Sequence, residues 1–111
     1  MSTVTTHVLD STLGRPAAGV PVRLDYLGEC PVSQVAAAVT DGDGRVHQFG
    51  PAHLQAGIYR LVFDTAVYFA ASGMTTFYPE VAVSFVIDSD EGHYHVPLLL
   101  SPFAYATYRG S

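Results

Sequence analysis

The chain has 111 residues, the length of one domain, and 49% of them are hydrophobic whereas only 14% are charged. Five arginines, no lysine and ten acidic residues give a net charge of −5, which excludes the basic surface of a nucleic-acid-binding protein. The chain has a single cysteine, Cys30, and it has neither a membrane-length apolar run nor a secretion signal. We therefore predict one cytoplasmic domain over residues 1–111, without a membrane partner.

Alternating apolar side chains predict β-strands along most of the chain. In the first strand, residues 4–9, Val4 and Val8 share one face, and Thr5 and His7 share the other. The same alternation, rich in β-branched and aromatic residues, predicts further strands at residues 20–27, 34–40, 45–48, 57–63, 80–87, 93–100 and 104–108.

Clusters of glycine and proline, such as Gly14–Pro16, separate these strands and are predicted to be turns. In the strand at 20–27, the alternation turns Asp25 away from the core. Residues 64–73 are predicted to form one short helix, with Asp64 as the N-cap and a glycine at the end. About eight short strands and one short helix predict an all-β fold, a two-sheet antiparallel β-sandwich.

The histidines are the first candidates for chemistry, because imidazole titrates near neutral pH. His93 and His95 share a face of their predicted strand, whose even positions are apolar and form the core face. His95 therefore points away from the core, as His7 does on the first strand, and the two side chains could meet at a subunit interface. His47 and His53 lie in or near turns and are predicted to be ordinary surface side chains.

The sequence offers only a weak metal site. His93 and His95 form a possible zinc hook with His7 as a third ligand, but no acidic or thiol ligand has the matching spacing, so we predict none. The segment Asp41–Gly44 partly resembles a calcium loop, but it lacks the bidentate glutamate and is predicted to be a turn. Arg45 follows this turn, and its ordinary interpretation is a solvated arginine at the start of a strand.

Four motifs, in order along the chain, resemble a known family. They are Thr6–Asp10 followed by Gly14–Ala17, then Thr40–Arg45, then His93–Pro102, and finally Tyr108–Ser111. Together they resemble the 5-hydroxyisourate hydrolases of the transthyretin-like family, in which the last tetrapeptide separates the enzymes from transthyretin itself. The resemblance runs from Thr5 to the end of the chain, and four ordered motifs are far more specific than any one of them.

The resemblance implies an activity, an assembly and a site. The activity is hydrolysis of 5-hydroxyisourate to 2-oxo-4-hydroxy-4-carboxy-5-ureidoimidazoline in urate breakdown, by opening of a cyclic amide without metal or cofactor. The assembly is a homotetramer, a dimer of dimers. The implied catalytic residues are His7, Arg45, His95 and Ser111, and the implied substrate-binding residues are His7, Arg45, Tyr108 and Arg109. A transthyretin-like carrier of a small aromatic ligand is the alternative.

These residue types suit the implied reaction. The guanidinium of Arg45 can hold a planar anionic ring through two hydrogen bonds and stabilise negative charge on a carbonyl that becomes tetrahedral. A histidine can activate water or protonate the leaving nitrogen, and activity should fall as it is protonated near pH ~6.5. The sequence leaves open which of His7 and His95 takes which role.

Overall fold

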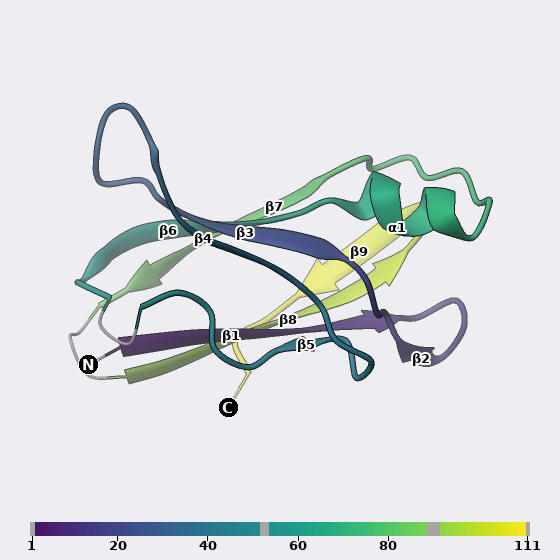
Figure 1. Cartoon of the computed structure of the whole chain (residues 1–111), viewed down its shortest axis with the longest axis horizontal. Helices are drawn as coiled ribbons and strands as arrows, with labels where there is room; N and C mark the ends of the chain where they lie inside the picture. The colour runs from purple at the N-terminus through teal and green to yellow at the C-terminus, as the bar shows by residue number, and fades with distance from the viewer. Residues whose placement is uncertain (1, 52–53, 89–91, 111) are drawn as a thin grey trace.

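The structure is a computed structural model that describes residues 2–51, 54–88 and 92–110. The chain folds into two β-sheets packed face to face, with one short helix at one end of the sandwich (Figure 1). The strands are β1 (Ser2–Asp10), β2 (Arg15–Pro16), β3 (Pro21–Tyr26), β4 (Ser33–Val39), β5 (Arg45–Val46), β6 (Gly57–Phe63), β7 (Val81–Ile87), β8 (Gly92–Ser101) and β9 (Ala104–Thr107). The helix α1 is Thr65–Ala71.

One sheet has the order β2-β1-β8-β9, with β5 also pairing with β1, and the other has the order β4-β3-β6-β7. The predicted two-sheet sandwich is confirmed. Every described strand pair is antiparallel except β1–β8, which runs parallel from Ser2↔Gly92 to Asp10↔Leu100. The two strands point the same way because the chain crosses to the other sheet and returns between them.

The core lies where the sequence alternation places it. The even positions from Val4 to Asp10 in β1 and from Tyr94 to Leu100 in β8 are buried, as are Tyr59, Leu61 and Phe63 of β6, which are at most 2% exposed. Asp25 is the exception, since only 3% of it is exposed although it leaves the core face. Arg23 and Arg60 cover its carboxylate, with N–O distances of 3.1 and 3.0 Å, and a buried carboxylate needs such partners.

Two segments differ from the prediction in detail. Arg15–Pro16, expected in a turn, pairs with Leu9 and Asp10 because Gly14, at φ 67, reverses the chain. The strand expected at 45–48 is only two residues long, and the helix is confirmed within 64–73. Asp64 caps the helix by accepting a hydrogen bond from the backbone N–H of Val67. No helix in the described ranges is long and apolar enough to cross a membrane.

Candidate functional site

Strand register brings three of the predicted site residues to one face. His7 pairs with Arg45 across β1 and β5, and Thr5 pairs with His95 across β1 and β8. His7, Arg45 and His95 are all half-buried, on the outward face of the five-stranded sheet. The structure therefore places two imidazoles and one guanidinium from three different strands next to one another.

A tight turn delivers Arg45 to this face. The carboxylate of Asp41 accepts hydrogen bonds from the backbone N–H groups of Asp43 and Arg45, at 2.9 and 3.0 Å, and these bonds hold its pKa below the usual range. Gly44 has φ 73, and a side chain there would collide with the carbonyl oxygen of Val8. The predicted turn is confirmed, and only glycine lets it lie this close to β1.

His95 is held in its neutral form. Burial lowers the pKa of its imidazole, and electrostatic interactions with Arg45, His93 and His7 lower the pKa further, while a hydrogen bond with the backbone of Thr5 opposes the shift. The hydroxyl of Thr5 lies 2.8 Å from Nδ1 of His95. A half-buried, neutral imidazole beside a fixed guanidinium can accept a proton from water at neutral pH.

A hollow of about 330 Å³ opens in front of Arg45 and His95, and His7 is not among the residues that line it. It is lined by Thr5, Thr6, Arg45, Val46, His47, His93 and His95. His47, which the sequence placed at a turn surface, is therefore at the site, and its Nε2 lies 3.5 Å from Asp41. The sequence contained an indication of this position, because His47 stands two positions after Arg45 on the predicted strand and residues two apart share a face.

The C-terminal tail reaches His95 by continuing the edge of the sheet. The backbone N–H of Gly110 donates to the carbonyl of His95 at 2.8 Å, and a Cβ on Gly110 would lie 2.6 Å from Cδ2 of that imidazole. Tyr108 is exposed. The catalytic residue implied at Ser111 lies outside the described residues, as does His53.

Arg109 does not line this hollow, but it lines a neighbouring one of about 220 Å³ together with His95 and Tyr108. Its guanidinium lies over the ring of Tyr94, 4.7 Å from the ring centroid, and Tyr94 is on the core side of β8 whereas His95 is on the outward side. The hydroxyl of Tyr94 in turn donates to the carboxylate of Asp88 at 2.8 Å. Arg109 therefore anchors the tail to the sandwich through a cation–π contact.

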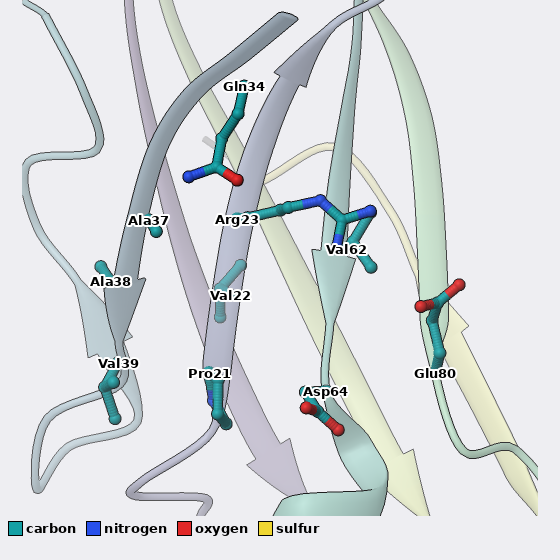
Figure 2. Close-up of a pocket in the computed structure, with 10 residues that line it drawn as sticks. All are labelled: Pro21, Val22, Arg23, Gln34, Ala37, Ala38, Val39, Val62, Asp64 and Glu80. Atoms are coloured by element: carbon teal, nitrogen blue, oxygen red, sulfur yellow. The ribbon is translucent and has the colours of Figure 1, made fainter. Parts of the chain in front are cut away.

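A larger hollow, about 540 Å³, lies on the four-stranded sheet and contains none of the predicted site residues. Figure 2 shows Arg23 extending across the strands there, with Gln34 above it and Asp64 and Glu80 below. Arg23 is already paired with Asp25. This hollow has no histidine and no cluster suited to acid–base chemistry, so the candidate site remains the histidine face.

The side chains that meet on the histidine face are imidazoles and one guanidinium. Within the described part of the chain, no three His, Cys, Asp or Glu side chains are placed to hold a metal ion. Cys30 is exposed, in the loop between β3 and β4. The groups that do converge are a cation and imidazoles, which bind an anion and move protons.

Comparison with known proteins finds relatives along nearly the whole chain. Residues 4–110 match the sequence model of the HIUase/Transthyretin family. The 5-hydroxyisourate hydrolase of Mus musculus is 45% identical over 114 residues, covering 99% of this chain and 96% of the relative. The structure of Klebsiella pneumoniae 5-hydroxyisourate hydrolase superposes with a TM-score of 0.88 at 41% identity, covering 100% and 94%. Transthyretin from Sparus aurata superposes with a TM-score of 0.91 at 33% identity, covering 97% and 96%.

Proposed function

The chain belongs to the HIUase/transthyretin family, and we propose that it is a hydrolase that performs the reaction named for its relatives, the hydrolysis of 5-hydroxyisourate. The product is 2-oxo-4-hydroxy-4-carboxy-5-ureidoimidazoline, formed by opening of a cyclic amide. The observation that carries the proposal is the convergence of His7, Arg45 and His95 on one outward face. A carrier needs no such acid–base pair.

The chemistry assigns a role to each group. Arg45 binds the planar anionic ring and stabilises the negative charge that develops on the attacked carbonyl oxygen. His95 is the base, since its lowered pKa keeps it neutral, and it takes a proton from the attacking water. His7, next to Arg45, then protonates the leaving ring nitrogen. Tyr108 and Ser111 complete the site from the tail, and Arg109 supports it by holding the tail on Tyr94.

The active form in this proposal is a homotetramer, a dimer of dimers, in the cytoplasm. Two observations support the assembly. The outer edges of β7 and β9 have no strand partner in the described chain, and Val86 and Phe103 are 59% and 69% exposed. The hollow at the histidines is also open on a single chain, so neighbouring subunits would be needed to enclose a substrate.

The proposal is tested by mixing the protein with freshly generated 5-hydroxyisourate and following the ultraviolet absorbance of the substrate. We expect faster decay than in a no-protein control, and decay near the control rate with Arg45→Gln. Binding of the substrate without faster decay would instead support the transthyretin-like carrier, the alternative that the likeness to Sparus aurata transthyretin favours.

A further inference from the structure

A chain of hydrogen bonds leads from the surface to His95. Thr3 Oγ1 lies 2.8 Å from Nδ1 of His93, and Nε2 of the same ring lies 3.1 Å from Thr5 Oγ1. Thr5 Oγ1 lies 2.8 Å from Nδ1 of His95. The two imidazoles are almost parallel, with an interplanar angle of 11° and centroids 6.4 Å apart. The parallel register of β1 and β8 creates this chain, because Thr3 pairs with His93 and Thr5 with His95.

The hydroxyl of Thr5 makes the chain directional, because it has one proton to donate and stands between two ring nitrogens. If it donates to His93, then Nδ1 of His95 must carry a proton and donate to Thr5. The backbone of Thr5 also forms a hydrogen bond that favours the protonated ring of His95.

With the proton on Nδ1, the lone pair of His95 is on Nε2, the nitrogen that is not engaged by β1. His93 then accepts from Thr5 at Nε2 and donates from Nδ1 to Thr3, so each member of the chain is satisfied. The charged or titratable groups that interact with His95 are Arg45 on β5, His7 on β1 and His93 on β8, and His47, Tyr108 and Arg109 line the hollows beside it. No acidic side chain in the described residues contributes to the shift of His95, so this neutral chain takes the place of an orienting carboxylate.

We propose that Thr3, His93 and Thr5 are positioning residues that hold His95 in the tautomer protonated at Nδ1, with Nε2 free to act as the base. This inference rests on the proposed hydrolase function, and it gives Thr5 and His93, which line the hollow, the role of orienting His95. It gives His93 a role that differs from metal binding and from direct catalysis. Thr5 is the central member, because its hydroxyl alone joins the two imidazoles.

The test is Thr5→Val, which keeps the shape of the side chain and removes the hydroxyl. Nitrogen-15 NMR of the histidine rings reports which nitrogen of His95 carries the proton, and needs no substrate. We expect the valine variant to lose the preference for a proton on Nδ1, and its kcat to fall roughly 10- to 100-fold with little change in KM. Thr5→Ser should restore both, because it restores the hydroxyl.

His93→Phe provides a second variant, and its exposed position makes misfolding of the variant a minor concern. It should also weaken the preference of His95 for a proton on Nδ1. Thr76→Val is the matched control, because the hydroxyl of Thr76 donates to the carbonyl of Pro102 away from the site. It should change neither the tautomer of His95 nor kcat.

A Thr5→Val protein whose His95 keeps the wild-type tautomer overturns the inference, as does a Thr5→Ser protein that restores neither the tautomer nor kcat. A wild-type protein that shows the tautomer but no turnover would instead overturn the proposed function.

Discussion

At the scale of single residues, the chemistry depends on the protonation of one imidazole. The unperturbed value for histidine would centre the loss of activity near pH ~6.5. Burial and the surrounding positive charges lower the pKa of His95, so its neutral form persists to more acidic pH. We predict that kcat/KM is retained at pH 7 and falls as the pH decreases through a midpoint below ~6.5. A profile of kcat/KM against pH checks this, and a midpoint above that value would contradict the assignment of His95 as the base.

Gly110 is the second residue on which the site depends, because its Cα faces the ring of His95. A methyl group at this position would lie 2.6 Å from Cδ2 of the imidazole, closer than side-chain atoms approach one another. We predict that Gly110→Ala displaces the ring or the tail and lowers kcat at least tenfold, equivalent to about 1.4 kcal/mol. The midpoint of thermal unfolding should stay near the wild-type value, because the residue lies outside the core. Full activity in the alanine variant would show that the tail does not position His95.

At the scale of elements, the turn before β5 decides where Arg45 lies. Gly44 has φ 73 and stands against the carbonyl of Val8, and the backbone N–H of Val8 donates to the carbonyl of Gly44 at 2.7 Å. We predict that Gly44→Ala lowers the free energy of unfolding by about 1–3 kcal/mol and moves Arg45 out of position. Urea unfolding should show the lower free energy of unfolding, and a lower kcat/KM should show the displacement of Arg45.

Gly42 provides the control for that prediction, since a Cβ added to it meets no atom within 4 Å. Gly42→Ala belongs to the same turn, and we expect it to leave both measurements close to those of the wild type. Equal losses in the two variants would mean that the turn tolerates no substitution at all, and that the contact with β1 is not the cause.

At the scale of the whole molecule, an open site on one chain implies that assembly completes it. We predict that light scattering finds a particle of four times the 11.9 kDa chain mass. Dilution that dissociates this particle should reduce specific activity in parallel. A monomer with full specific activity at every concentration would contradict the proposed tetramer and require a substrate that binds in the open hollow.

Local patterns were enough to predict several parts of this protein from its amino-acid sequence. Alternation at period two located the strands and turned His7 and His95 outward, because neighbouring side chains of a strand point to opposite faces. The cap at Asp64 located the start of the helix, because an unpaired N–H needs a local acceptor.

Only the tertiary structure decided how distant segments meet. The parallel pairing of β1 with β8 joins residues 90 positions apart, and no local pattern specifies that register. That pairing places Thr5 between His93 and His95, and it makes the hydrogen-bonded chain possible. The covering of Asp25 by arginines and the contact of Arg109 with Tyr94 likewise arise across strands. Periodicity assigns a side chain to a face, whereas its partners depend on which strand lies beside it, and long-range packing sets that arrangement.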